Sequence, residues 1–188
     1  MLELATEVFC ERGYAGASMN EIAARCGISK PMLYLYFDSK ERLYLACVTF
    51  VGDALLDAIG TSVADAHTAT EQILATAAGL FDFADQRNRA WWAVIYGETM
   101  PADSAVASAT NGYKDRILAI VLRAMTSVLD DPLDAELAAY ALIGAGESLL
   151  RWWLLRPDVS AAELNARLAR ILAPFLTGIT APAKSPQA

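Results

Sequence analysis

The sequence predicts an all-α protein with a small helix-turn-helix domain followed by a larger helical domain. Apolar residues recur at helical spacing through most of the chain, and no segment alternates as a β-strand would. The chain has 188 residues, of which 55% are hydrophobic, so it can bury a substantial core. Glycine and proline fall between the periodic segments, where helices end. We therefore expect about nine helices.

The first three predicted helices are short and closely spaced. The first ends near Gly13. The second begins at Ser18, which forms a capping-box pattern with Glu21. It ends at Gly27, because glycine readily adopts the left-handed backbone conformation that often follows a helix. Ser29 then begins a third helix that runs to about Phe37.

A long helix follows, with Asp38 as its expected cap, and it continues to about Gly60. A polar break over residues 61–70 contains His67, the only histidine. Further helices are expected at about 71–86, 88–99, 104–129, 133–155 and 161–178.

Residues 18–37 have the pattern of a helix-turn-helix motif, whose second helix enters the major groove of DNA. Small Ala23 would allow the two helices to cross closely, and Leu33 and Phe37 should face inward. The residues left pointing outward are Ser29, Lys30, Pro31, Tyr34 and Leu35. On spacing alone, an ordinary three-helix bundle with tyrosines at its rim remains an alternative.

The region as a whole resembles the DNA-binding domain of the tetracycline-repressor (TetR/AcrR) family. The resemblance covers residues 2–50 and is carried by FCERGY at 9–14, SMNEIA at 18–23, GISKP at 27–31 and LYLYFDSKE at 33–41. It implies a homodimer, a partly palindromic operator in double-stranded DNA, and an effector pocket in the C-terminal domain.

The resemblance also implies roles for individual residues. Lys30, Pro31 and Leu35 would face base edges. The residues that would hold phosphates are Ser18, Tyr34, Tyr36 and Lys40. We therefore expect a DNA-binding domain at residues 1–46 and a ligand-binding and dimerisation domain at 47–188.

Two features depart from the family pattern. Leu35 occupies a position where a polar or aromatic side chain is common, and the sequence starts within the first helix, without the usual basic segment before it. Residues 1–50 hold five Lys and Arg against six Asp and Glu, and the whole chain has a formal charge of −7. Two explanations follow: either a basic segment is missing from the start of this sequence, or nonspecific DNA binding is weak.

The C-terminal domain carries many aromatic residues. Neighbouring residues on a helix diverge by about 100°, so two adjacent Trp pairs cannot all fill one core stripe. We expect some of these rings to line an apolar effector pocket, although core filling is the alternative for each ring. The candidates for the wall are Trp91, Trp92, Tyr96, Tyr113 and Trp152.

Glu147 is the unusual charge in the predicted helix 133–155. It would either pair with Arg151 one turn later or act as a pocket carboxylate that selects the ligand. The rest of this helix is slim and apolar nearly all round. With 161–178 it would form a four-helix interface in the dimer, the alternative being a central helix of a monomer.

These features favour a repressor that a small lipophilic or aromatic effector releases from a palindromic operator. The alternative is a ligand-independent DNA-binding dimer that docks a protein partner. We expect no enzyme, because no catalytic, metal-binding or phosphate-loop pattern is present, and hence no cofactor or metal. Three cysteines without redox or metal spacing favour the cytoplasm, and we expect no membrane segment.

Overall fold

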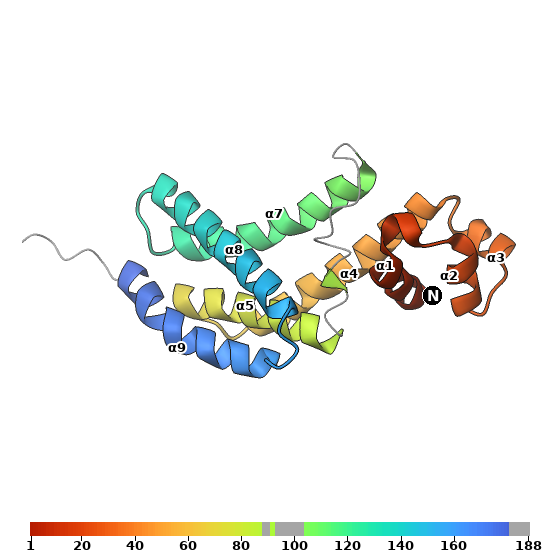
Figure 1. The fold of residues 1–188 in the computed structure, drawn as a ribbon. Coiled ribbons are helices and arrows are strands. Elements are labelled where there is room, and N and C mark those ends of the chain that lie inside the picture. Colours follow the sequence, from red (N-terminus) through yellow and green to blue (C-terminus); the bar gives the residue numbers. More distant parts are fainter. Residues whose placement is uncertain (88–90, 93–103, 181–188) are drawn as a thin grey trace, which may run out of the picture. The chain divides into compact units, whose positions relative to one another are not determined.

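The computed structural model describes residues 1–87, 91–92 and 104–180. Within them the protein has eight helices and no strand, which confirms the all-α prediction (Figure 1). The predicted helix at 88–99 lies almost entirely outside the described residues. The helices are α1 (Leu2–Gly16), α2 (Met19–Arg25), α3 (Lys30–Tyr36), α4 (Lys40–Val63), α5 (Ala69–Gln86), α7 (Ala105–Thr126), α8 (Pro132–Leu154) and α9 (Ala161–Thr180).

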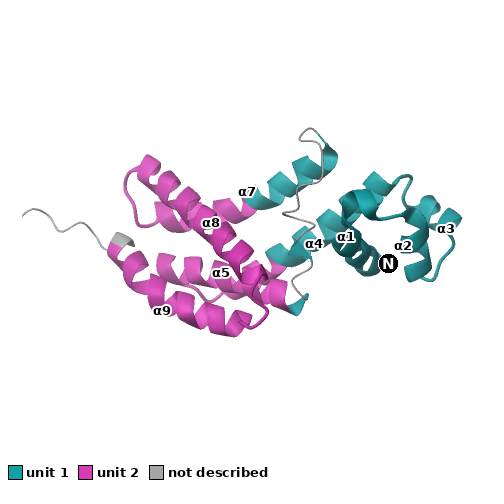
Figure 2. Ribbon diagram, in the orientation of Figure 1, with its two compact units in different colours: residues 1–56, 86–114 teal, residues 57–85, 115–188 magenta. Residues whose placement is uncertain are grey.

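The chain divides into two compact units (Figure 2). Unit 1 contains residues 1–56 and 86–114, and unit 2 contains residues 57–85 and 115–188. Both α4 and α7 therefore contribute residues to each unit. The boundary between the two domains was expected after residue 46, whereas the two compact units divide the chain at other positions. The division by function, into DNA-binding and ligand-binding domains, therefore stays a prediction.

The core of unit 1 is built against one face of α4. This face carries fully buried side chains at helical spacing, among them Leu43, Val48, Val51 and Leu55. Burial of each such side chain stabilises the fold by about 1.5–3 kcal/mol. α4 is long and apolar enough to cross a membrane by length and composition alone, and 44% of its apolar window is buried within the protein.

Helices α2 and α3 each begin at a serine cap, as predicted. The Ser18 hydroxyl accepts a hydrogen bond from the backbone N–H of Glu21 at 3.1 Å, and Ser29 accepts from that of Met32 at 3.3 Å. Gly27 lies between the helices with a φ of +68°, the left-handed conformation that a turn needs here. These local interactions set the lengths of α2 and α3.

α4 begins one residue later than expected. We predicted Asp38 as the cap, but the hydroxyl of Ser39 accepts the hydrogen bond from the backbone N–H of Arg42, at 3.1 Å. Both residue types cap helices well, so the sequence pattern alone does not distinguish them.

α1 is interrupted where the sequence predicted its end. Gly13 has a φ of +68°, which is not a helical backbone conformation. A further turn after this break carries α1 on to Gly16. Just beyond this break, the ring of Tyr14 lies 5.1 Å from the ring of Tyr44 on α4. The glycine thus allows the chain to turn while the aromatic packing continues.

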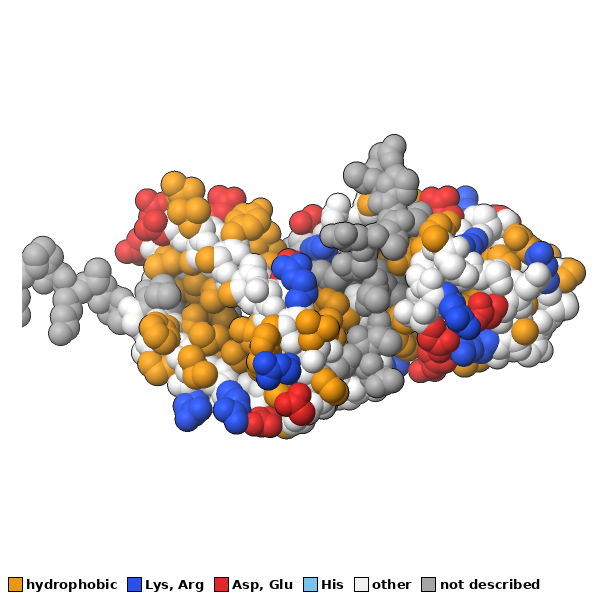
Figure 3. All heavy atoms as spheres, viewed as in Figure 1, with side chains coloured by type: hydrophobic (Ala, Val, Ile, Leu, Met, Phe, Trp, Pro, Cys, Tyr) orange, Lys and Arg blue, Asp and Glu red, His pale blue; other side chains and the backbone are white. Residues whose placement is uncertain are grey.

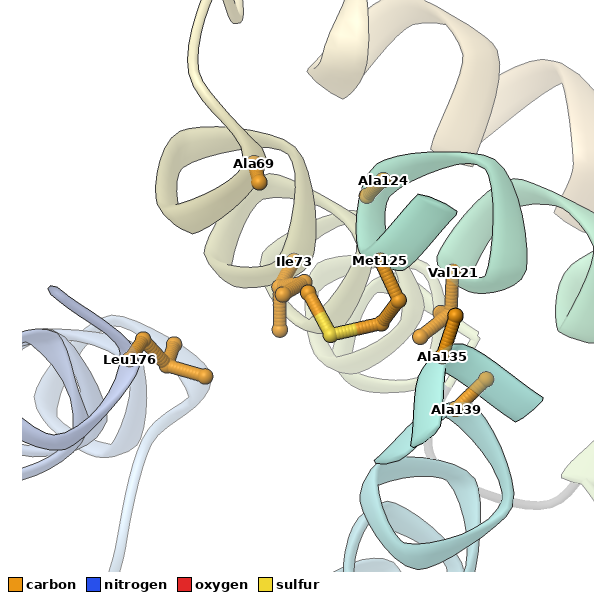
Figure 4. Packing of buried hydrophobic residues seen from close by; sticks show 8 residues of the cluster. All are labelled: Ala69, Ile73, Val121, Ala124, Met125, Ala135, Ala139 and Leu176. Carbon is orange, nitrogen blue, oxygen red and sulfur yellow. The ribbon is translucent and has the colours of Figure 1, made fainter. Parts of the chain in front are cut away.

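The core of unit 2 joins four helices (Figure 4). Its buried residues come from α5, α7, α8 and α9 and are Ala69, Ile73, Val121, Ala124, Met125, Ala135, Ala139 and Leu176. Beside them, Trp153 is fully buried and packs edge-on against Phe81 at 5.5 Å between ring centroids. Its indole N–H donates to the carbonyl of Val159 at 2.8 Å, which satisfies the polar atom of the buried ring.

The polar break between α4 and α5 forms a capping box that the sequence analysis did not identify. The hydroxyl of Thr68 accepts from the backbone N–H of Glu71 at 3.2 Å, and the Glu71 carboxylate accepts from those of His67 and Thr68 at 2.9 and 3.0 Å. These backbone donors lower the pKa of Glu71. His67 thus has a structural place at the start of α5.

The three cysteines are free thiols in unit 1. Burial raises the pKa of the Cys10 thiol to about 12 and that of the Cys47 thiol to about 11. These two thiols therefore stay protonated and unreactive at neutral pH.

Gly79 marks a close approach between α5 and α4 in unit 2. A Cβ atom at this position would lie 2.9 Å from the Cα of Ile59 and 2.9 Å from the hydroxyl oxygen of Ser62. The first of these atoms is backbone, so it cannot move aside without shifting α4.

We predict that Gly79→Ala lowers the free energy of unfolding by about 1–3 kcal/mol because it overpacks this contact. Gly60→Ala is the matched control, because Gly60 is a helical glycine with no atom within 4 Å of the added Cβ. It should instead stabilise the protein by about 0.5–1 kcal/mol through helix propensity. Urea unfolding measures both, and equal stability of the two variants would contradict the close contact.

Candidate DNA-binding site and effector-domain residues

α3 exposes a continuous face above a small buried core. Leu33 is fully buried and Phe37 is partly buried, as the sequence predicted. Leu35 is 78% and Tyr36 62% exposed. The exposed side chains of α3 are Lys30, Pro31, Met32, Tyr34, Leu35 and Tyr36.

Met32 is the residue on this face that the sequence analysis missed. Its side chain is 42% exposed, and it lies one helical turn before both Leu35 and Tyr36. That spacing was the available signal. The sequence analysis assigned Met32 neither to the core nor to the exposed face.

Lys30 and Tyr34 form a pair on the same face, with the Lys30 Nζ 6.0 Å from the centroid of the Tyr34 ring. The capping hydroxyls of Ser18 and Ser29 use an oxygen lone pair toward the backbone. A hydroxyl has one donor besides its acceptor lone pairs, so each can still donate to a phosphate oxygen.

Lys40 holds the end of α1. Its Nζ donates to the carbonyl of Ala15 at 3.3 Å and lies 4.7 Å from the centroid of the Tyr14 ring. An ammonium group has three donors, so this contact leaves capacity for a phosphate. Lys40 therefore combines a structural contact with its predicted phosphate contact.

Two arginines of unit 1 are neutralised between α1 and α2. Arg12 Nε lies 3.2 Å from Glu21 Oε1, and Arg25 forms a bidentate pair with Glu11 at 2.7 and 3.1 Å. The Arg25 guanidinium lowers the pKa of Glu11. Among the described residues of the first fifty, the cations outside such ion pairs are Lys30, Lys40 and Arg42.

Trp91 and Trp92, the first two predicted ligand residues, are both buried in unit 1. The ring of Trp91 lies 5.5 Å from that of Phe50 on α4, and the guanidinium carbon of Arg87 lies 4.3 Å from its centroid. Arg87 also pairs with Glu3 of α1 at 3.4 Å. Arg87 and Trp91 thus contact α1 and α4 respectively. Tyr96 lies outside the described residues.

Tyr113 fastens α7 to α4 within unit 1. Its hydroxyl lies 2.7 Å from Asp53 Oδ1 and 3.2 Å from the carbonyl oxygen of Thr49. The ring covers Gly52 so closely that a Cβ atom there would overlap a ring carbon. Tyr113 is therefore a packing residue of this unit, and its ligand-binding role stays a prediction.

Glu147 and Trp152 lie on α8 in unit 2, whereas Trp91, Trp92 and Tyr113 belong to unit 1. Glu147 is partly buried, and the side-chain ion pair expected between it and Arg151 is not formed in the described part of the chain. A helix-surface pair of this kind is worth only a few tenths of a kcal/mol, about 0.2–0.5, so its absence costs little.

The adjacent residues Trp152 and Trp153 point in different directions, as the helical geometry requires. Trp153 is fully buried, whereas Trp152 is 45% exposed, with the guanidinium carbon of Arg156 lying 5.1 Å from its ring centroid. An exposed ring on α8 fits an interface better than a closed pocket wall. Within the described residues, no cluster of three or more His, Cys, Asp or Glu side chains could hold a metal ion.

Unit 2 exposes many large apolar side chains on α8, on α9 and at Leu155, the residue that follows α8 (Figure 3). On α8 they follow helical spacing, as Leu133, Leu137 and Tyr140 show with exposed fractions of 61, 60 and 58%. We call this set the α8–α9 apolar surface. Its members are Leu133, Leu137, Tyr140, Trp152, Leu155, Ile171 and Phe175.

Comparison with known proteins agrees with this arrangement. Residues 1–47 match the family model described as "Bacterial regulatory proteins, tetR family", and residues 69–174 match "Tetracyclin repressor-like, C-terminal domain". The HTH-type transcriptional activator FasR of Mycolicibacterium smegmatis is 31% identical over 160 residues, covering 82% of this chain and 70% of FasR.

Solved structures show the same fold. A TetR-like transcriptional regulator from Rhodococcus sp. RHA1 superposes with a TM-score of 0.78 at 29% identity, covering 94% of this chain and 93% of that one. AibR, solved in complex with isovaleryl coenzyme A and operator DNA, has a TM-score of 0.76 at 21% identity, with 92% and 96% covered. The helix-turn-helix geometry, the two family models and these relatives agree, and the chain belongs to the TetR family of transcriptional regulators.

Proposed function

We propose that this TetR-family regulator is a homodimeric repressor that binds a palindromic operator through α2 and α3 and is released by a small lipophilic or aromatic effector. The observation that carries the proposal is the exposed face of α3, whose six side chains stand above a single fully buried leucine. The second helix of a helix-turn-helix lies in the major groove, and α3 holds that place with its side chains accessible to base edges and phosphates.

The residue roles follow from position on α3 and at the helix starts. Lys30, Pro31 and Leu35 lie on the exposed face of α3 and are assigned to base edges. Hydroxyl and ammonium groups suit phosphate contacts, which position the protein without reading sequence. The residues assigned to phosphates are Ser18, Ser29, Tyr34, Tyr36 and Lys40.

The α8–α9 apolar surface supports the homodimer. Seven large apolar side chains exposed in one unit are unusual for a soluble monomer, and such surface commonly marks an interaction site. Two helices from each of two subunits can bury such surfaces against each other in a four-helix arrangement. We place the protein in the cytoplasm, where its three free thiols would remain reduced.

The effector site stays a prediction, and Trp91, Trp92 and Tyr113 of unit 1 are its candidate contacts. AibR was solved with isovaleryl coenzyme A, and this makes acyl thioesters of coenzyme A sensible first compounds to test. α4 follows α3 directly, so a ligand-dependent shift of α4 would change the distance between the two copies of α3 in the dimer. Operator binding needs that spacing near one DNA turn, about 34–36 Å.

A ligand-independent DNA-binding dimer that docks a protein partner is the second candidate. The observation favouring it is that Tyr113 and Trp91 are already packed, one over Gly52 and the other against Phe50. FasR is named as an activator, so the direction of regulation is also part of the test.

We predict that Lys30→Ala and Lys40→Ala have different effects on DNA binding. Lys30→Ala should change sequence preference at about 1–3 kcal/mol for one base pair, without loss of thermal stability, because its side chain is exposed. Lys40→Ala should weaken binding to all sequences, reduce the salt slope by about 0.9 per phosphate lost, and lower stability because it frees the carbonyl of Ala15. Fluorescence anisotropy across a salt series, with thermal melts, measures both; identical behaviour of the two variants would contradict these roles.

We predict that Leu137→Glu dissociates the dimer, because it places a charge within the α8–α9 apolar surface. Leu35→Glu is the matched control, since Leu35 is a similarly exposed leucine outside this surface and should leave the dimer intact. Sedimentation equilibrium at micromolar concentration gives the association state. A wild-type chain that sediments as a monomer would contradict the homodimer.

We predict that an effector lowers operator affinity by about 5–150-fold, the range of typical allosteric coupling. The measurement is anisotropy of an operator selected from a random duplex pool, titrated with isovaleryl coenzyme A and with aromatic and lipophilic compounds, alongside tryptophan fluorescence. Release of DNA by one of them, with saturable quenching, is expected. Unchanged affinity across the panel would favour the ligand-independent dimer.

A further inference from the structure

Three neighbouring residues on the exposed face of α3 are apolar. Pro31 and Leu35 are one turn apart, and Met32 precedes Leu35 by three residues, so the three side chains share one side of the helix. We call them the apolar face of α3. Lys30 is the only charged residue in this seven-residue helix.

We propose that the apolar face of α3 reads thymine through its C5-methyl group, with Leu35 as the principal specificity-determining residue. This inference rests on the proposed function, because it requires α3 to enter the major groove. There, base edges present hydrogen-bond donors and acceptors, and the thymine methyl is the characteristic apolar group. A leucine can neither donate nor accept, so it gains most by burying its side chain against that methyl.

Contact between Leu35 and the edge of a purine base would be unfavourable. A leucine pressed against a guanine or adenine edge would remove water from N7 or an exocyclic group and offer no hydrogen bond in return. Leu35 is 78% exposed in the protein, the highest exposed fraction among the large apolar residues of α3. It therefore has the most apolar surface to bury on binding.

The position of Lys30 adds an expectation about the operator. Lys30 precedes Leu35 by five residues, which is about 7.5 Å along the helix axis. Five residues also turn the helix by about 500°, so Lys30 and Leu35 point in different directions and would contact different base pairs. Because a lysine in the major groove pairs best with guanine O6 and N7, each half-site should hold a guanine besides the thymine read by Leu35.

Replacing thymine by deoxyuridine tests the inference, because the two differ only by the methyl group. The full chain first selects duplexes from a random pool, and the tightest duplex is then synthesised with each thymine replaced singly. We expect replacement at one or two positions in each half-site to weaken binding by about three- to fivefold, as loss of one buried methyl predicts. Replacement at flanking thymines should have no effect.

Variants of Leu35 assign the contact. Leu35→Ala should weaken binding to the thymine duplex and abolish the uridine effect at the contacted position, whereas Leu35→Met should retain much of it. Tyr36→Phe is the matched control: it removes a hydroxyl assigned to a phosphate, so it should lower the affinity for the thymine and uridine duplexes by the same factor and leave their ratio unchanged. Because the substituted side chains are exposed, circular dichroism should show the same fold for all three variants.

The outcomes separate this inference from the proposed function. If the selection enriches no duplex, the proposed operator binding fails, and the thymine reading fails with it. If it enriches duplexes in which every thymine can be replaced without loss of affinity, operator binding stands and the thymine reading is wrong. A uridine effect that persists in Leu35→Ala would assign the methyl contact to another side chain and overturn the role of Leu35.

Discussion

The positions of α1, α2 and α3, which form the DNA-binding domain with α4, depend on the burial of one face of α4. α1 contributes only a short apolar stripe, and α2 and α3 have few fully buried side chains, Ile22 and Leu33 among them. Helices of seven residues are not stable alone, so their position must come from packing. The buried stripe of α4 provides the long element of that core. The same helix passes into unit 2, and Gly79 lets α5 approach it closely there.

Electrostatics set a second constraint, because the DNA-binding domain has few basic side chains outside ion pairs. The ion pairs of Arg12 and Arg25 with glutamates fix α2 against α1 at the surface, where each contributes little to stability. Their consequence for DNA binding is larger, since a neutralised arginine attracts phosphate less. Sequence-independent affinity should therefore be low. The exposed apolar and hydroxyl-bearing residues of α3 would then supply much of the specificity.

Most of the fold could be predicted from the sequence because local signals decide it. Ser18, Ser29 and Gly27 set the ends of the reading helices, and the structure places them as predicted. Choices between equivalent local signals could not be predicted, as Ser39 in place of Asp38 shows. Local spacing also indicated five outward-facing residues at the start of α3 and along it, whereas Ser18, Tyr36 and Lys40 came from the family resemblance and Met32 was missed. By contrast, the packing of Tyr113 over Gly52 joins residues far apart in the chain, and no periodic pattern specifies such a contact.

Two copies of α3 should lie in successive major grooves of one operator. Dimethyl sulfate footprinting can show this arrangement, because the reagent methylates guanine N7 in the major groove and adenine N3 in the minor groove. We expect protection of guanine N7 in two patches about 10 base pairs apart on the selected duplex, the centre-to-centre spacing of half-sites on one face of DNA. A single protected patch, or protection confined to adenine N3, would contradict it.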